Sequence, residues 1–350
     1  MKIAFYQLFG EKSKGGLDAA VSRLKTRLEL SGVDVRVAGP GVDLTGVNLV
    51  HFHGLWQPAW RAVAKSCRSE GRPYLISPHG MLEPWSLRQK TWKKWPYYHL
   101  FEKNFLGNAS CILATSRMEA GNILKLLPGR KVEMIPLGLP SIKGPDYSAA
   151  RKRLGWDRKV ILFLSRVHPK KGLHLLLQAL RELHKKGIRD YKLVIVGSGE
   201  SGYLSQLQAY CRSHVRSLPE IEWTGEIWGE ARWDYFQGAD LFCLPSYSEN
   251  FGLAVLESLQ VGTPVLTTDQ TPWGDCKGQA GCYICSPDVK SLCHNLENWF
   301  QSSEWDEGAR DVLATSIHEA YRWDVLMPRY LALYKELLVA HHLTKNGPLG

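Results

Sequence analysis

The stretch from Ala239 to Trp273 constrains the fold more than any other part of the chain. It begins with the apolar run ADLFCLP and continues through SYSENFG, whose residue types favour turns. LAVLESLQVG then places apolar residues at helical spacing and ends on Gly262, a residue typical of helix C-termini. A second apolar run, TPVLTTD, follows. This order predicts a strand, a loop, a helix and a strand, the unit from which parallel sheets are built.

The same alternation of apolar runs and amphipathic segments extends over most of the 350 residues. It is interrupted by GLPSIKGPDYS (residues 138–148), which is rich in Gly, Pro and Ser and is typical of a linker. The chain is long enough for two domains. We therefore predict an α/β protein with two doubly wound, Rossmann-like domains facing across a cleft. Their predicted bounds are residues 1–145 and 146–317, and a helical pattern follows at about 318–343.

The net charge of +10 lies entirely in the first part of the chain. Residues 1–150 hold 21 Lys and Arg against 11 Asp and Glu, whereas the remaining residues hold 23 of each. This imbalance predicts an anionic partner for the first domain: membrane phosphates, a phosphorylated acceptor or nucleic acid. A basic surface that serves only solubility is the alternative.

Apolar runs of about 18 residues, the length that spans a bilayer, are absent from the sequence. The apolar stretch at its start is short and broken by charge, so we expect no secretion signal there. We expect a cytoplasmic protein with its eight cysteines reduced. A zinc cluster of Cys276, Cys282, Cys285, Cys293 and His294 is the alternative interpretation. Against it, GCYICSP is predicted to be a strand, on which Cys282 and Cys285 point to opposite faces, whereas a structural zinc site needs a tight turn between paired ligands. The spacing therefore argues against a structural zinc site.

Two carboxylates, Glu249 and Glu257, bracket the predicted loop-to-helix turn. The free amides of a helix start favour an anion such as phosphate. Carboxylates beside it are suited to accept hydrogen bonds from the hydroxyls of a ribose or a sugar. Glu257 interrupts an apolar run, where an unpartnered carboxylate is rarely buried. These features predict a nucleotide-sugar site; the alternative is a solvated loop residue and an ordinary acid on a helix face.

SRVHPKKG, residues 165–172, follows the first predicted strand of the second domain. Its cations Arg166 and Lys171 suit a diphosphate, whose departing negative charge must be stabilised. A basic helix start on the surface is the alternative interpretation. IVGSGE (195–200) lacks the third glycine of a dinucleotide fingerprint, which argues against a dehydrogenase.

Two His-Gly pairs end neighbouring predicted strands of the first domain, in HFHGLW and SPHGML. Ligands of parallel sheets bind at the carboxyl ends of strands, so His53 and His79 are candidates to hydrogen-bond a sugar hydroxyl. A structural role is the alternative for either one. The Gly15-Gly16 pair, after the first strand, allows close approach of the backbone to a substrate or phosphate.

Residues 85–105 interleave basic residues, among them Arg88, Lys93 and Lys94, with tryptophan and tyrosine. This mixture suits an anionic membrane interface or single-stranded nucleic acid. A surface helix whose aromatic residues pack inward is the third interpretation. Pro96 is expected to interrupt a long helix here.

Taken together, these segments resemble glycosyltransferase family 4, retaining nucleotide-sugar glycosyltransferases with the GT-B fold. The resemblance is strongest in SRVHPKKGLHLLLQAL, IVGSGE, IEWTGEI and PSYSENFGLAVLESLQVGTPVLTTD, where the last contains two glutamates separated by seven residues. HFHGLW and SPHGML resemble enzymes of bacterial surface-polysaccharide synthesis. Many relatives have glycine where this chain has Ser165.

The resemblance implies a role for each matching residue. Arg166 and Lys171 would bind the donor diphosphate, Glu257 the ribose, and Glu249 the donor sugar. His79 would lie near the reacting sugar. The remaining implied donor contacts are Gly16, Phe251, Gly252, Leu253 and a base-bordering region at Ile227, and the implied acceptor-side residues are His53, Trp56, Arg88, Lys93 and Lys94. The final helices would pack back onto the first domain.

Together with the basic first half, the resemblance implies retaining sugar transfer from a nucleotide sugar to a lipid-linked saccharide, with no metal and no cofactor. We expect this reaction at the inner face of the membrane, in exopolysaccharide, capsule or lipopolysaccharide synthesis. Two alternatives are a GT-B epimerase acting on a nucleotide sugar and a basic nucleic-acid-binding protein.

Overall fold

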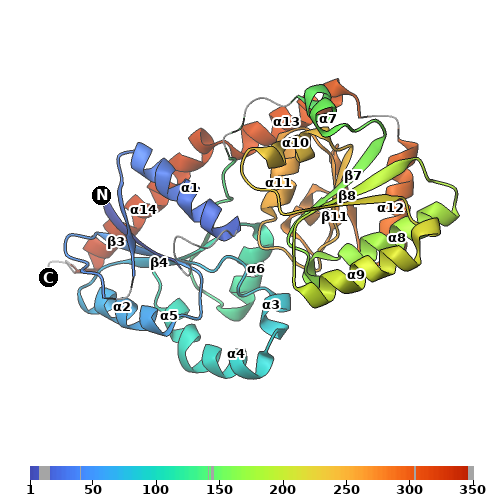
Figure 1. The fold of residues 1–350 in the computed structure, drawn as a ribbon. Helices are drawn as coiled ribbons and strands as arrows, with labels where there is room; N and C mark the ends of the chain where they lie inside the picture. Colours follow the sequence, from blue (N-terminus) through green and yellow to red (C-terminus); the bar gives the residue numbers. More distant parts are fainter. Residues whose placement is uncertain (8–15, 40, 141, 143–145, 303–304, 346–350) are drawn as a thin grey trace. The chain divides into compact units, whose positions relative to one another are not determined.

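The computed structural model describes residues 1–7, 16–39, 41–140, 142, 146–302 and 305–345. The chain divides into two compact units (Figure 1). Residues 1–138 and 321–350 form the first unit, and residues 139–320 form the second. The first crossing between them therefore lies seven residues before the boundary expected at 145/146, and the return lies at 320/321.

The first unit is built on a six-stranded parallel sheet with the order β2-β1-β3-β4-β5-β6. Its strands are β1 (Lys2–Gln7), β2 (Asp34–Ala38), β3 (Leu49–His53), β4 (Tyr74–Ser77), β5 (Cys111–Ala114) and β6 (Val132–Met134). Its helices are α1 (Gly16–Leu30), α2 (Pro58–Ser69), α3 (Pro84–Arg88), α4 (Thr91–Tyr97), α5 (Lys103–Gly107), α6 (Arg117–Leu126) and α14 (Trp323–Lys345), with a π-helical turn at Tyr98–Glu102 between α4 and α5.

The period of two along β1 separates the core of this unit into two layers. Ile3 and Phe5 belong to the layer that contains α1 and α14, whereas Ala4 and Tyr6 belong to the opposite layer. α14 contributes six buried side chains to its layer: Trp323, Met327, Tyr330, Leu333, Tyr334 and Leu337. The C-terminal helix is thus an integral part of the first unit, and Pro328 lies within it.

The second unit repeats the layout with the strand order β12-β11-β10-β7-β8-β9, again parallel. Its strands are β7 (Lys159–Leu164), β8 (Tyr191–Val196), β9 (Glu220–Gly225), β10 (Leu241–Leu244), β11 (Val265–Thr268) and β12 (Cys282–Cys285). Its helices are α7 (Tyr147–Leu154), α8 (Leu173–Lys185), α9 (Ser201–Ser213), α10 (Ala231–Gly238), α11 (Leu253–Gln260), α12 (Val289–Gln301) and α13 (Glu307–Tyr321).

Each sheet has a point at which the chain reverses its direction of winding. In the first unit this point lies between β1 and β3, and in the second between β7 and β10. Loops at the carboxyl ends of such neighbouring strands diverge and leave a crevice for ligands. Among the described residues, the fold therefore singles out the loops after β3, β7 and β10. Among the described residues, each helix is too short or too polar to cross a bilayer.

Candidate functional site

The loops that follow β7 and β10 are tied together in the second unit. The Tyr247 amide donates to the carbonyl oxygen of Lys170 over 2.8 Å. Gly172 has a φ of +70°, and a Cβ there would lie 2.0 Å from the carbonyl oxygen of Pro245. Only glycine fits this close approach of two backbones. The approach brings the basic segment 168–171 against the loop that carries Glu249.

Lys171 and Glu249 form an ion pair at this point. The Lys171 Nζ lies 2.6 Å from the Glu249 Oε1, which also accepts a 2.6 Å hydrogen bond from Ser246 Oγ. Glu249 is 7% exposed. Burial opposes ionisation, but the Lys171 charge and the hydrogen bonds from Lys171 and Ser246 outweigh it and hold the pKa of Glu249 below its ordinary value. The carboxylate is therefore ionised and oriented.

Glu257 has a different cationic partner. Its Oε1 accepts a hydrogen bond from the Arg232 guanidinium over 2.9 Å, and Glu257 is 4% exposed. Arg232 lies on α10, in a segment whose sequence shows no phosphate or sugar motif, and it is not among the residues predicted for the site. The sequence indicated this contact only indirectly. A carboxylate in an apolar run such as that of Glu257 needs a partner when it is buried, but the sequence does not identify the partner.

The start of α11 lies four positions after Glu249. Gly252 has a φ of +77° and precedes the helix, and Leu253 is its first residue. The first amides of a helix have no carbonyl partner within the helix, so they remain available to a ligand. Trp273 supports this turn: its indole N–H donates to the Phe251 carbonyl oxygen over 2.6 Å.

The other predicted donor residues are placed as follows. Arg166 is exposed in the loop after β7. Ile227 is half-buried in the loop after β9, next to Trp228, which is 51% exposed. Gly16 is exposed at the start of α1, and Gly15 lies outside the described residues. The second unit therefore groups Lys171, Glu249 and the α11 start, while Gly16 belongs to the first unit.

In the first unit, His53 and His79 lie at the ends of β3 and β4 and are hydrogen-bonded to each other. The His53 Nδ1 lies 3.1 Å from the His79 Nε2, and the rings are stacked. His79 has a φ of +52°, which is strained for a residue with a side chain. Gly80 donates its amide to the buried Glu119 over 2.6 Å and holds this turn. Burial lowers the pKa of His79 to about 3.

The acceptor-side residues do not form one continuous basic surface. Arg88 and Lys93 are exposed, but Lys94 is half-buried and donates to the Ser86 carbonyl oxygen over 2.6 Å. Burial, together with the charge of Lys90, lowers the pKa of Lys94. Pro96 does not end the helical segment, because α4 passes directly into the π-helical turn at 98–102.

Trp56, also predicted on the acceptor side, has a φ of +68° and donates its amide to Glu102 Oε1 over 2.8 Å. Glu102 lies in the π-helical turn and is 1% exposed. Burial raises the pKa of this carboxyl to about 7, although the Trp56 amide and the charge of Arg61 oppose the shift. No local pattern in the sequence indicates this buried acid.

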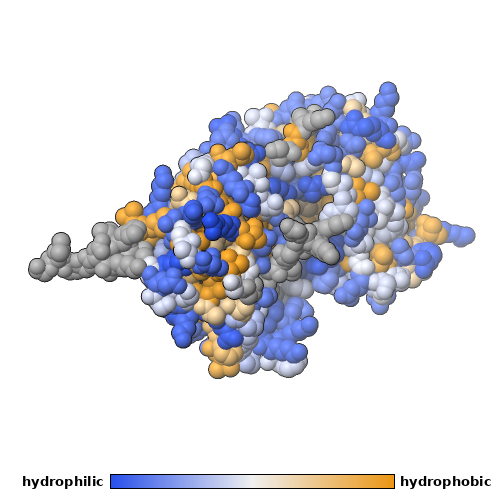
Figure 2. Space-filling view, turned by 60° about the vertical axis from the view of Figure 1, so that its left-hand side comes forward, coloured by the Kyte–Doolittle hydropathy of each residue, from blue (hydrophilic) through white to orange (hydrophobic). Residues whose placement is uncertain are grey.

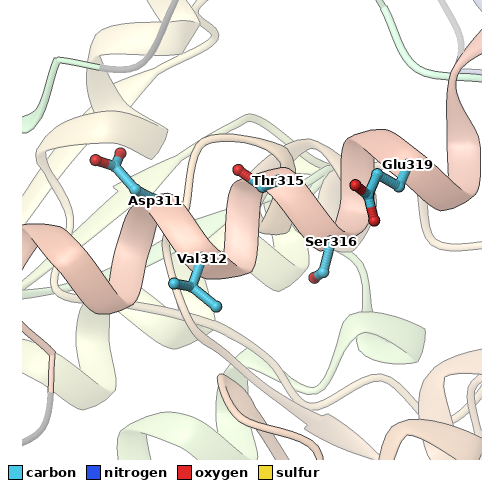
Figure 3. Close-up of a pocket in the computed structure, with 5 residues that line it drawn as sticks. All are labelled: Asp311, Val312, Thr315, Ser316 and Glu319. Atoms are coloured by element: carbon cyan, nitrogen blue, oxygen red, sulfur yellow. The ribbon is translucent and has the colours of Figure 1, made fainter.

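Two hollows elsewhere in the second unit are lined by none of these residues. One, of about 380 Å³, is lined by Asp311, Val312, Thr315, Ser316 and Glu319, which project from a single helix, α13 (Figure 3). It offers no cation for a phosphate, so we place the candidate site at the loops after β7 and β10 instead. Within the described residues, His, Cys, Asp and Glu side chains form no cluster of three suited to a metal ion.

Two family models match the chain in tandem. The model described as Glycosyltransferase Family 4 matches residues 42–141, and the one described as Glycosyl transferases group 1 matches residues 146–307. The second match contains every candidate of the second unit described above. Both matches support the predicted glycosyltransferase over the alternative of a nucleic-acid-binding protein.

The chain is 30% identical over 286 residues to the teichuronic acid biosynthesis glycosyltransferase TuaC of Bacillus subtilis, covering 78% of this chain and 67% of TuaC. It is 26% identical over 218 residues to the phosphatidyl-myo-inositol mannosyltransferase of Mycobacterium leprae, covering 59% of this chain and 56% of that protein. With another curated relative, a D-inositol 3-phosphate glycosyltransferase, the match spans only 38% of the relative's length.

A crystal structure of Anabaena HepE in complex with UDP-glucose matches with a TM-score of 0.74 at 17% identity, over 96% of this chain and 100% of that one. At this identity the likeness shows the fold, which is GT-B with two Rossmann-like domains. The two family models and the extended match to TuaC show the activity class. This chain is a glycosyltransferase and belongs to glycosyltransferase family 4.

Proposed function

We propose that the protein transfers a sugar from a nucleotide sugar to a saccharide acceptor in the synthesis of a surface polysaccharide or glycolipid, with retention of configuration. The observation that carries the proposal is the Lys171–Glu249 ion pair at the point where the second sheet reverses its winding. It sets a cation for phosphate next to a carboxylate for hydroxyls, four residues before the first amide of α11.

In this proposal Arg166, Lys171 and the amides of Gly252 and Leu253 bind the donor phosphates. Glu249 binds the transferred sugar, and Glu257, held by Arg232, binds the ribose. The cations stabilise the negative charge that develops on the leaving diphosphate. Because they can fill the role that a divalent ion fills elsewhere, we propose that the reaction needs no metal.

The likeness to HepE, which was crystallised with UDP-glucose, supports a nucleotide-sugar donor. The likeness to a phosphatidyl-myo-inositol mannosyltransferase supports an acceptor that carries a lipid. Membership of family 4 supports retention. For the first unit we propose that His79 contacts a sugar hydroxyl and that the exposed basic residues of α3 and α4 face an anionic membrane.

A thermal-shift screen of nucleotide sugars tests the donor, since a ligand that binds the folded state raises the melting temperature. Transfer to a saccharide acceptor is then measured in Glu257→Ala and Lys171→Ala variants with EDTA present. We expect a loss on the order of a hundredfold for each. Wild-type turnover in both variants would refute the site, and dependence of the wild type on added Mg²⁺ would refute the metal-free reaction.

The anomeric configuration of the first-formed product, followed by proton NMR, tests retention. Release of nucleotide with a free, epimerised sugar and no glycoside would favour the epimerase alternative instead.

A further inference from the structure

Two cysteines of the second unit, Cys276 and Cys282, have their thiols in contact. Two consecutive turns bring them together: the Gln279 amide donates to the Cys276 carbonyl oxygen over 3.0 Å, and the Cys282 amide donates to the Gln279 carbonyl oxygen over 3.1 Å. Gly278 and Gly281 both have a positive φ and allow this tight path. The two thiols share a side-chain hydrogen bond, and neither is part of a disulfide.

The other two cysteines considered for a zinc cluster do not join this pair. Cys285 is buried and acts electrostatically on the buried Cys243. Cys293 is buried on α12, where the charges of Lys186 and Glu297 act on it. Among the described residues the group is therefore a pair of thiols and not a set of metal ligands.

The pair is accessible to a small molecule. Cys276 and Cys282 are each partly exposed, and both line a hollow of about 430 Å³ that Trp305 and Leu313 also line. Pockets of about 300–1,000 Å³ accommodate small ligands. A small oxidant can therefore reach the sulfur atoms through this hollow.

The two thiols differ in acidity. The hydrogen bond with Cys282 lowers the pKa of Cys276, although burial and the charge of Asp275 oppose the shift. The same hydrogen bond, together with burial, raises the pKa of Cys282. Since the thiolate is the form that attacks a disulfide, Cys276 is suited to attack an oxidant and Cys282 to resolve the product.

We propose that Cys276 and Cys282 are a redox pair, which a low-molecular-weight disulfide oxidises to an intramolecular disulfide. The Cys276 thiolate attacks one sulfur of the oxidant, forms a mixed disulfide and expels a first thiolate. Cys282 then gives up its proton and attacks the Cys276 sulfur, which expels the second thiolate and closes the bond. The protein loses two electrons and two protons, and the oxidant is reduced to two thiol molecules.

The bond fastens a segment that supports the candidate donor site. Cys276 ends the 3₁₀ turn at Pro272–Cys276, and this turn carries Trp273, whose indole holds the Phe251 carbonyl oxygen before α11. Cys282 begins β12 at the edge of the second sheet. Oxidation ties the turn to the sheet and restricts the unfolded chain, so it should raise the melting temperature. The redox chemistry does not depend on the proposed sugar transfer.

Incubation of the full-length protein with reduced and oxidised glutathione tests the pair. A short segment holds the two thiols at an effective concentration on the order of 1 mM or more, so at least about half of the protein should contain the disulfide with about 1 mM of each form. After free thiols are blocked, cleavage at Lys277 and Tyr283 separates Cys276, Cys282 and Cys285 into different peptides. Mass spectrometry should detect the first two peptides joined before reduction and separate after it.

Single variants distinguish the roles of the two thiols. Cys282→Ser should accumulate a glutathione adduct on Cys276, because the resolving thiol is missing. Cys276→Ser should react about tenfold more slowly or less, because burial still raises the pKa of Cys282. Cys211, which is also partly exposed, is the internal control. Burial raises its pKa to about 11, so it should also be modified about tenfold more slowly than Cys276.

Oxidation of the wild type should raise the melting temperature by roughly 5 °C, and dithiothreitol should reverse the change. The double variant Cys276→Ser, Cys282→Ser should show no such response. Absence of the joined peptides in the folded wild type, or a glutathione adduct that stays on Cys276 without closing the disulfide, would overturn the redox pair. Joined peptides with an unchanged melting temperature would refute the fastening of the turn.

Discussion

At the scale of single residues, buried charges are matched to specific partners. Glu249 is set by Lys171 and Ser246, Glu257 by Arg232, and Glu119 by the amides of Gly80 and Thr115. A buried ion is stable only where such partners replace the water that it loses. Removing one partner is therefore expected to affect folding as well as catalysis.

Lys171→Met tests this for the donor loop. It leaves the Glu249 carboxylate buried without its cation, which is expected to lower the free energy of unfolding by about 3–5 kcal/mol at neutral pH. The pKa of Glu249 is lowered in the fold, so the stability from its ionised form is present above the ordinary pKa of glutamate and is lost as the pH falls through the folded pKa.

Urea unfolding at several pH values measures both effects. The difference in the free energy of unfolding between Lys171→Met and the wild type should become smaller as the pH falls. The double variant Lys171→Met, Glu249→Gln should recover most of the lost stability. A difference in the free energy of unfolding that does not change with pH would contradict the stabilisation of ionised Glu249 by Lys171.

Glu102 should affect stability in the opposite direction to Glu249 as the pH rises, and Glu102→Gln removes this effect. The folded carboxyl has a pKa of about 7 and keeps its proton where the unfolded chain has lost it, so the stability of the wild type falls as the pH rises from about 4.5 to 7. Glutamine stays neutral and can still accept the Trp56 amide. Relative to the wild type, the free energy of unfolding of the variant should increase by about 3 kcal/mol between about pH 4.5 and 7. Urea unfolding measures this change. Glu336→Gln, at an exposed glutamate of the same unit, is the control for the change of residue type alone.

At the scale of elements, the candidate site depends on how loops approach one another at the carboxyl ends of strands. The loop after β7 touches the loop after β10 through Gly172, and the turn into α11 rests on Trp273. These contacts are between backbones or against a backbone, so a single methyl group is enough to displace them.

Gly172→Ala should therefore separate Lys171 from Glu249. Its Cβ would lie 2.0 Å from the Pro245 carbonyl oxygen, in a backbone with a φ of +70°. Gly187→Ala is the control, because Gly187 has a φ of +90° but a Cβ there would meet no described atom within 4 Å. Backbone strain alone should lower the free energy of unfolding of the control by about 1–2 kcal/mol. Gly172→Ala should lower it by about 2 kcal/mol more. Thermal unfolding compares the two; equal losses would show that the loop yields without cost.

At the scale of the whole molecule, charge and exposed hydrophobic side chains are unevenly distributed. The excess of +10 lies in residues 1–150. In that part α4 and the following π-helical turn expose Trp92, Leu100 and Phe101 beside Lys90 and Lys93. Hydrophobic residues, in orange, are visible at the lower edge of the view in Figure 2. Cations next to exposed apolar side chains suit the interface of an anionic bilayer.

Neutralising Lys90 and Lys93 should weaken binding to vesicles that contain anionic lipid. Each cation near such a surface contributes about 1 kcal/mol at low salt, so the double Gln variant should partition about thirtyfold less. Replacing Lys277 and Lys290, exposed cations of the second unit, is the control and should have little effect. Flotation in a density gradient measures the bound fraction. Absence of wild-type binding at low salt would refute the membrane proposal.

Local patterns in the sequence were sufficient to predict the elements, whereas the roles of the predicted site residues stay predictions. The alternation of apolar runs and amphipathic segments predicted two parallel α/β units, and the segment 239–273 folds as the predicted strand, loop, helix and strand, with Gly262 at φ +76° after α11. Such features depend on neighbours a few positions apart, so hydrophobic period and turn chemistry reveal them.

Which groups meet became known only from the folded chain. Arg232 holds Glu257, Tyr334 reaches His51 from 283 positions away, and Glu102 is buried under Trp56. These pairs join segments that the fold brings together, and a single sequence contains no local pattern for them. The same packing decides the partners of the predicted residues: Lys171 forms an ion pair with Glu249, and His53 is hydrogen-bonded to His79. Polar groups that lose water on burial need such hydrogen-bond or charge partners within the protein.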